Sequence, residues 1–336
     1  MSMSSKACAI AVAGMMTATV VQAETLIVTT NLTPSHWAST EGGEPFLACV
    51  KERTEGQIDF QYYHSGQLAN FFESLNAVNS GLAQVSYIVL AAQSDKLPLT
   101  GLSMLPGLGS SVAEVVGATR AALDGEGLIA QEYASNNIVP LMVNVFPAYQ
   151  MVSRAEPLDS LAAIRGKRIS SGGGPLLVTL NALGAVPIES ATSDVYLSMQ
   201  QGTVDGSMLS LASVKPYNLH EVMTSASFNG SFGVATGIWS IDRGVWDGLP
   251  AEQQAALRDC GLEVENRLAE WTDNWLADVR TELEGAGVTV FDYSPEELTV
   301  IEDHLREARQ EYIDRLSARG LPAQEAYDQY ILGLSN

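Results

Sequence analysis

Side chains that could perform covalent or metal chemistry are few in this chain, and none falls into a known catalytic spacing. The sequence has no Gly-x-Ser-x-Gly turn, no Walker phosphate loop, no His-Glu-x-x-His pair and no Cys-x-x-Cys pair. Its four histidines are spread along the chain: His36, His64, His220 and His304. With so few Cys and scattered His, a metal site is not expected. We therefore expect neither an enzyme nor a bound cofactor.

A glycine cluster, Gly172 to Gly174, follows a predicted strand and is the one segment that could suggest phosphate binding. It lacks the Gly-x-Gly-x-x-Gly spacing, and Pro175 follows it immediately. Lys and Arg are also too few to suggest a phosphoryl clamp. The cluster is therefore interpreted as a turn or as a place where the backbone closely approaches another segment.

Bulk composition excludes several classes of partner. The chain has 336 residues and a formal net charge of −21, and 46% of its residues are hydrophobic. An acidic surface repels nucleic acid and anionic membranes, so neither is expected as a partner. The apolar content is ample for packed cores, and the length allows two lobes.

The first 23 residues have the pattern of an export signal. Lys6 supplies a positive start, residues 7–21 are largely apolar, and Val21-Gln22-Ala23 is a small-residue cleavage site. No other stretch approaches 18 uninterrupted apolar residues, so stable membrane insertion is not expected. The sequence predicts a periplasmic protein that is cleaved near Ala23.

Strands and helices are predicted to alternate, which is typical of an α/β protein. Strands are expected at 26–29, 57–62, 85–90, 138–146, 167–170 and 185–188, and apolar residues run from 232 to 241. A helix is expected over 45–53. A long helix should begin at Pro250, and Ser294 with Glu297 forms a capping box that should start the last long helix.

The segment 157–206 is similar to the extracytoplasmic receptor subunit of tripartite ATP-independent periplasmic (TRAP) transporters. The family has three motifs here: a Gly-x-Lys-x-Arg strand, Gly-Ala-x-Pro-Val, and a helix ending in Gly-x-Val-Asp-Gly. This chain follows the pattern at Gly166, Arg168, Gly184, Ala185, Pro187, Tyr196, Gln200, Gly202, Val204, Asp205 and Gly206. One position departs from the pattern. The arginine that ends the family's strand, where it clamps a ligand carboxylate, is Ser170 here.

The resemblance implies a periplasmic binding protein-like fold with two discontinuous α/β lobes. The first lobe would contain residues 24–146 and 235–274, and the second would contain 147–234 and 275–336. Hinge strands and a long bracing helix would join the lobes, which would close on a ligand. The resemblance also implies a small organic solute as ligand and a small and a large membrane permease subunit as partners. We expect a monomer.

In such a receptor the ligand lies between the lobes, at strand ends. The candidate ligand-binding residues are Asn31, His36, Trp37, Gln67, Tyr87, Tyr149, Gln150, Arg168, Ser170, Ser171, Leu209 and Trp239. For His36, the alternative is a histidine at a helix entry or on the surface. For Trp37, the alternative is packing within the lobe. For Arg168, a solvated charge at the strand end is the alternative.

The exchange of arginine for Ser170 changes the ligand expected. A hydroxyl offers at most one neutral hydrogen bond where a guanidinium offers a charge-assisted pair, a difference on the order of 1.5 kcal/mol or more. Either the ligand lacks that carboxylate, or another cation such as Arg168 supplies the contact. With Leu209 and Trp239 nearby, the sequence predicts a less anionic, partly apolar organic solute.

Without Cys8 of the export signal, the chain keeps two cysteines, Cys49 and Cys260. An exported protein meets an oxidising compartment, and the family topology would place both in the same lobe. Two possibilities remain open: the cysteines form a disulfide, or they are two ordinary buried thiols.

Two other functions remain as alternatives. A periplasmic receptor could use the same cleft to control a signalling partner, and neighbouring permease genes would distinguish transport from signalling. A secreted α/β enzyme would consume the ligand that it binds.

Overall fold

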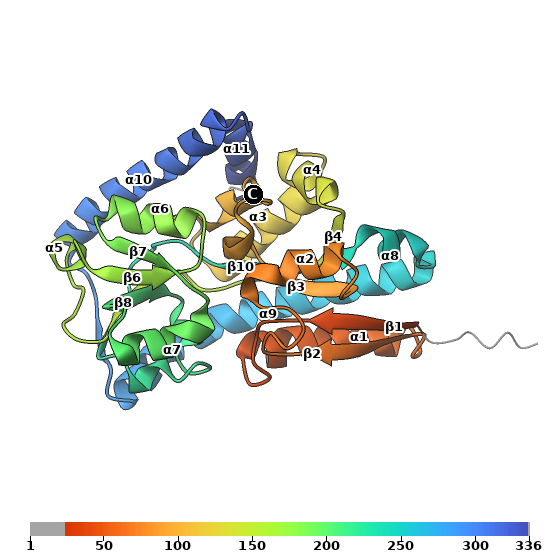
Figure 1. Cartoon of the computed structure of the whole chain (residues 1–336), viewed down its shortest axis with the longest axis horizontal. Helices are drawn as coiled ribbons and strands as arrows, with labels where there is room; N and C mark the ends of the chain where they lie inside the picture. The colour runs from red at the N-terminus through yellow and green to blue at the C-terminus, as the bar shows by residue number, and fades with distance from the viewer. Residues whose placement is uncertain (1–23, 335–336) are drawn as a thin grey trace, which may run out of the picture.

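Two β-sheets form the two halves of the molecule (Figure 1). The computed structural model describes residues 24–334, so the expected export signal lies outside the described part. The strand order is β2-β1-β3-β10-β4 in the first sheet and β11-β9-β5-β8-β6-β7 in the second. The predicted α/β class is therefore confirmed.

The first sheet is mixed. Its strands are β1 (Glu24–Thr29), β2 (Ile58–Tyr63), β3 (Val85–Val89), β4 (Ile138–Val145) and β10 (Thr236–Asp242). β1 runs parallel to β2 and β3, whereas β10 runs antiparallel to both β3 and β4. β3 is fully buried, and seven of the eight residues of β4 are buried, so both are continuous apolar runs in the sequence.

The second sheet is also mixed. Its strands are β5 (Gln150–Ser153), β6 (Arg168–Ser171), β7 (Val186–Glu189), β8 (Gly206–Leu209), β9 (Ser225–Ser227) and β11 (Thr289–Phe291). β6 is parallel to β7 and β8, and β5 is antiparallel to β8 and β9.

Helices cover both sheets. Those that follow strands of the first sheet are α1 (Glu44–Arg53), α2 (Ser74–Asn79), α3 (Val112–Asp124), α4 (Leu128–Ser135) and α8 (Arg243–Gly248). Those of the second half are α5 (Leu161–Ile164), α6 (Pro175–Ala182) and α7 (Thr192–Gln201), which ends at Gly202 in the left-handed conformation. The longest helices are α9 (Ala251–Gly285) and α10 (Pro295–Ala318), and α11 (Ala323–Leu334) is the last.

The chain passes between the sheets three times. It leaves the first sheet between β4 and β5, returns between β9 and β10, and crosses again along α9, after which β11 joins the second sheet (Figure 1). α9 begins just after Pro250 and buries an apolar stripe that includes Leu257, Val264 and Leu268. One rigid helix therefore supports both halves.

A buried ion pair fixes α9 to the first sheet. The Arg120 guanidinium of α3 donates to Glu265 of α9 (Nε to Oε1, 2.9 Å), and Glu265 Oε2 also accepts the backbone N–H of Val143 on β4 at 2.7 Å. Burial raises the pKa of Glu265, whereas these donors oppose that shift. Because Val143 lies on an edge strand, the carboxylate also satisfies a backbone donor that no further strand could pair.

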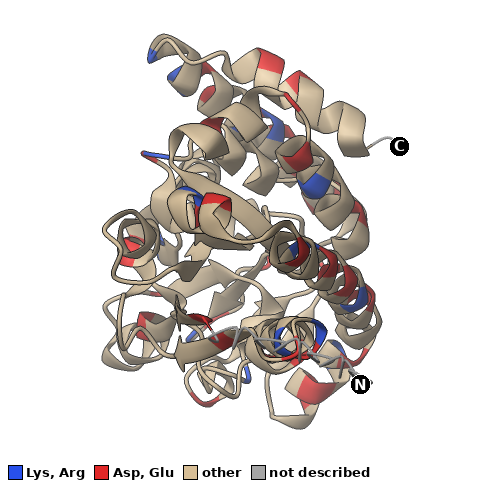
Figure 2. Ribbon diagram, turned by 90° about the vertical axis from the view of Figure 1, so that its right-hand side faces the viewer, with Lys and Arg blue, Asp and Glu red and all other residues tan. Residues whose placement is uncertain are grey.

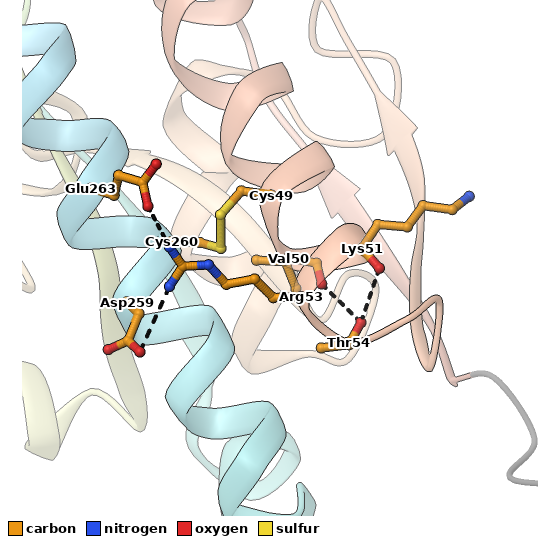
Figure 3. The surroundings of a disulfide bond; sticks show 8 residues. All are labelled: Cys49, Val50, Lys51, Arg53, Thr54, Asp259, Cys260 and Glu263. Atoms are coloured by element: carbon orange, nitrogen blue, oxygen red, sulfur yellow. Dashed lines mark hydrogen bonds and ion pairs between the residues drawn. A yellow bond between two sulfur atoms is a disulfide. The ribbon is translucent and has the colours of Figure 1, made fainter.

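A disulfide joins α1 to α9 (Figure 3). It links Cys49 and Cys260, whose Cα atoms are 5.8 Å apart. Beside it, Arg53 of α1 forms ion pairs with Asp259 and Glu263 of α9. Both connections lie within the first half of the molecule.

The C-terminal helices depart from the expected second lobe. α10 begins there, where Ser294 caps it by accepting from Glu297 N at 3.2 Å, but farther along it Tyr312 donates to Pro98 O at 3.1 Å. α11 packs on α3 of the first half, where Tyr330 OH lies 3.2 Å from Thr119 Oγ1. Residues 295–334 therefore contact both halves, α10 packing on α6 of the second half and α11 on α3 of the first.

Acidic residues dominate the surface, as the net charge requires. The sequence has 39 Asp and Glu against 18 Lys and Arg, and Figure 2 shows acidic positions spread over several helices. Within residues 24–334, no helix combines the length and the apolar composition that crossing a bilayer requires.

A candidate ligand cavity between the two sheets

A cavity lies where loops of the two halves meet. Its empty volume is about 430 Å³, with the space at its mouth included. The first half supplies three polar residues, Asn31, His36 and Tyr87. It also supplies an apolar set: Leu32, Phe71, Val89, Ala91, Phe146 and Ala235. The second half supplies Tyr149, Gly172, Thr192, Ser213 and Tyr217.

The loop after β1 delivers two of the polar residues. Backbone bonds from Thr30 N to Tyr63 O and from His36 N to Thr33 O fold this loop over the end of the sheet. Asn31 Oδ1 is buried and has no hydrogen-bond partner among the described residues. It therefore offers an unused acceptor to a ligand.

His36 is fully buried, with 0% of its surface exposed. Its Nδ1 accepts the backbone N–H of Ala38 at 3.0 Å, so the neutral ring carries its proton on Nε2. Burial lowers the pKa of His36 to about 3, because desolvation disfavours the charged ring. Nε2 is buried without a partner in the described part of the chain. His36 is therefore a neutral donor, not a cation.

Tyr87 stands on β3 and is held by its neighbours. Its hydroxyl donates to Asn144 Oδ1 at 2.8 Å, and its ring packs against Gly237, where a Cβ would lie 2.1 Å from the ring. Glycine is therefore required opposite this tyrosine. Because its hydroxyl is already bonded, Tyr87 shapes the cavity more than it offers a hydrogen bond.

Two tyrosines face the cavity from the second half. Tyr149 follows the first crossing, and Tyr217 follows the short turn Leu211–Ser213, which the Ser210 hydroxyl caps. Burial raises the pKa of Tyr217 to about 12 and also raises that of Tyr149, so both stay protonated. Neither hydroxyl has a hydrogen-bond partner among residues 24–334.

The two halves touch beside the cavity. A Cβ on Gly173 would lie 2.2 Å from Ala91 O and 2.5 Å from Glu189 Oε1. Only glycine allows the loop after β6 to approach the backbone of the first half so closely. The interpretation of the glycine cluster as a close approach agrees with this contact.

The cavity wall has no charged side chain among the described residues that line it. A second hollow shares Asn31, Phe71 and Tyr217 with the cavity and is lined by Asp194. Within residues 24–334, no cluster of three or more His, Cys, Asp or Glu residues could hold a metal ion.

The family model of bacterial extracellular solute-binding proteins, family 7, matches residues 29–315. This chain belongs to that family. The resemblance to TRAP receptors seen in the sequence is thereby confirmed. The family consists of binding receptors.

Several characterised relatives are similar along most of their length. A C4-dicarboxylate-binding periplasmic protein of Rhodobacter capsulatus is 26% identical, over 85% of this chain and 86% of its own. The ectoine-binding periplasmic protein of Halomonas elongata is 22% identical, over 85% of this chain and 83% of its own.

Solved structures show the same two-lobe fold. A marine metagenome TRAP solute-binding protein specific for aromatic acids superposes with a TM-score of 0.86 at 17% identity, covering 93% of this chain and 98% of that chain. A Bordetella pertussis receptor that binds pyroglutamic acid superposes with a TM-score of 0.82 at 20% identity, covering 92% of this chain and 99% of that chain. At these identities the likeness establishes the fold of this family 7 protein and not its ligand.

Four of the residues predicted for the site line this cavity: Asn31, His36, Tyr87 and Tyr149. They come from three separate segments, the loop after β1, strand β3 and the connection before β5, so only the fold brings them together.

The predicted tryptophans serve packing. Trp37 lies behind His36 and stacks on Trp271 of α9, with ring centroids 6.0 Å apart. Trp239 is fully buried on β10, between Tyr87 and Phe46, with ring centroids 5.3 and 6.5 Å away. Neither lines the cavity.

The β6 residues are engaged within the second sheet. Arg168 donates to Asp205 (Nη2 to Oδ1, 2.7 Å) and to Gly202 O, and its guanidinium lowers the pKa of Asp205. The Ser171 hydroxyl donates to Met208 O at 2.8 Å, and that of Ser170 faces Gly206 O at 3.5 Å. The guanidinium of Arg168 is thus already paired with the turn between α7 and β8.

Three further predicted residues lie away from the cavity wall. Gln150 accepts from the Ser227 hydroxyl at 2.9 Å and from Gly230 N at 3.0 Å, which holds the loop before the return crossing. Leu209 is buried at the end of β8, and Gln67 is exposed.

The residues that sequence reasoning missed are Leu32, Phe71, Val89, Ala91, Phe146, Gly172, Thr192, Ser213, Tyr217 and Ala235. Two of them lie in segments that the sequence does mark: Phe146 at the end of a predicted strand and Gly172 in the glycine cluster. Tyr217 carried no local signal, because it follows a turn whose position depends on the second sheet.

Proposed function

We propose that this protein is the extracytoplasmic receptor of a TRAP transporter and that its solute binds in the cavity between the sheets. One observation carries the proposal: aromatic and polar residues of both halves close around a single space. Loss of water on closure strengthens each polar contact inside such a space. The bound form would then deliver the solute to a small and a large membrane permease subunit.

Export and simple binding complete the proposal. Residues 1–23 would direct the chain to the periplasm and be removed near Ala23. The solute would leave unchanged, because the cavity wall holds neither a nucleophile paired with a base nor a pair of carboxyl groups.

Purification followed by mass spectrometry tests this function. The protein is incubated with a metabolite extract, desalted under native conditions and then denatured, and the released compound is compared with the compound in the extract. We expect one small organic compound, recovered unchanged, that raises the melting temperature when it is added back. Recovery of a chemically altered compound would instead support an enzyme.

A further inference from the structure

The uncharged wall of the cavity limits what it can bind. The carboxylate of an anionic ligand would leave water and meet no Lys or Arg among the described residues lining the cavity. An unpaired buried carboxylate is heavily penalised, since no cation offsets its lost hydration. Asp194, which lines the adjoining hollow, and the net charge of −21 add repulsion.

No lining residue can become the missing cation under periplasmic conditions. His36 has its Nδ1 committed as an acceptor of Ala38 N, which leaves it only the Nε2 proton. Arg168 is bonded to Asp205 and Gly202 of the turn between α7 and β8. The sequence position at which a guanidinium would be expected carries the Ser170 hydroxyl, which faces Gly206 O.

Two buried atoms on the cavity wall are available to a ligand. His36 Nε2 needs an acceptor, and Asn31 Oδ1 needs a donor, because neither has a partner in the described part of the chain. A group that supplies both without a net charge is an amide, in which a carbonyl oxygen and an N–H are close together. The free hydroxyls of Tyr149 and Tyr217 could bond a second polar group.

The rest of the wall favours a compact apolar skeleton. Phe71 and Phe146 are buried aromatic residues, and Val89 and Ala91 add aliphatic surface. Apolar contact with such residues contributes about 25 cal/mol for each Å² removed from water.

On the basis of the proposed function, we propose that this receptor takes an uncharged solute. It would be an amide or lactam on a compact, partly apolar skeleton, in place of a carboxylic acid. His36 Nε2 donates to its carbonyl oxygen, and Asn31 Oδ1 accepts from its N–H.

Sorting a metabolite extract by charge tests the proposal while the ligand is still unidentified. The extract is separated at pH 7 into anion-exchange-bound, cation-exchange-bound and unretained fractions, and each is added to the purified protein. We expect the unretained fraction to raise the melting temperature, and mass spectrometry of the bound compound to show an amide without an ionisable group. An acid, a zwitterion or a cation as the bound compound would overturn the inference and leave the receptor function intact. If no fraction raises the melting temperature, the result would count against both the uncharged ligand and the receptor function.

Matched probes and variants sharpen the result. Benzamide and 2-pyrrolidone should bind more tightly than benzoate and pyroglutamate, their acidic counterparts. For the recovered compound, His36→Phe and Asn31→Leu should each weaken affinity roughly tenfold or more, whereas His304→Phe, on α10, should not. If either cavity substitution unfolds the protein, Tyr217→Phe replaces it as the test variant, because it removes a single hydroxyl and keeps the ring. It too should weaken affinity for the recovered compound. Tighter binding of the acids, or unchanged affinity in the cavity variants, would contradict the assignment.

Discussion

At the residue scale, His36 shows how burial sets the chemistry of the cavity wall. A backbone N–H occupies its Nδ1, and desolvation lowers its pKa to about 3, so the side chain stays a neutral donor. A solvent-exposed histidine would be partly charged near neutral pH. The site thus gains a donor and avoids a charge.

This burial makes folding stability depend on pH. The unfolded chain protonates His36 below about pH 6.5, whereas the folded protein holds it neutral down to about pH 3. The unfolded state therefore binds more protons in this window, and the free energy of unfolding should fall as the pH drops from 6.5 toward 3. The contribution approaches about 1.4 kcal/mol per pH unit.

Denaturant unfolding at several pH values measures this effect. Asp205, whose pKa is lowered by Arg168, also loses stabilisation on acidification, so the comparison must be made with His36→Phe. The variant should show a shallower loss of stability between pH 6.5 and 4. Parallel pH profiles for the two proteins would show that His36 does not titrate as described.

At the element scale, the glycine loop after β6 and the turn after β3 decide how closely the halves meet. The loop is short and its residues lack side chains, so backbone meets backbone at Gly173 and Ala91. This contact lies beside Gly172 and Ala91, which line the cavity.

Gly173→Ala should hold the halves apart. Its new Cβ would lie 2.2 Å from Ala91 O, too close for the present arrangement. We expect solute affinity to fall at least tenfold, with little change in the melting temperature of the solute-free protein. Calorimetric titration provides the affinity, and Gly248→Ala, where a Cβ would meet nothing within 4 Å, is the control. Equal affinity in the two variants would rule out a closure role for this loop.

The disulfide between α1 and α9 should act on stability and not on binding. Both helices belong to the first half, and the closed loop spans 211 positions of sequence. Replacing both cysteines by serine should lower the free energy of unfolding by about 2–4 kcal/mol. Solute affinity should be unchanged, because neither cysteine lines the cavity. A large loss of affinity in the double variant would mean that the bridge also positions the cavity.

At the scale of the whole molecule, three passages of chain, one of them the long helix α9, connect the two sheets. Such a connection permits rotation of one half against the other while each half stays intact. α10 and α11 add a further link, since this helical pair starts in the second half and ends against α3.

Small-angle scattering should detect the closure. We expect the radius of gyration of the solute-free protein to exceed that of the solute-bound protein, because residues of both halves line the cavity. In Gly173→Ala the difference between the two states should be reduced. Identical scattering of the wild type with and without a stabilising solute would show a rigid molecule.

The sequence alone determined those features that depend on neighbouring residues. Apolar runs located β3 and β4 to within a residue, Pro250 marked the start of α9, and Ser294 marked the start of α10. These signals are local because hydrophobic periodicity and capping involve residues only a few positions apart. The motif pattern over 157–206 also identified the family.

Tertiary structure alone decided which side chains share the cavity and which helices cover which half. Arg168 and Tyr217 show the reason. Whether a charge is free or already paired, and whether a tyrosine is buried against a distant loop, depends on partners far away in the sequence. Asp205, in the turn before β8, pairs with Arg168 on β6, and the ring centroids of Tyr217 and His36 lie 5.7 Å apart. Local patterns do not encode such long-range partners, because they arise only when the two sheets and their loops assemble.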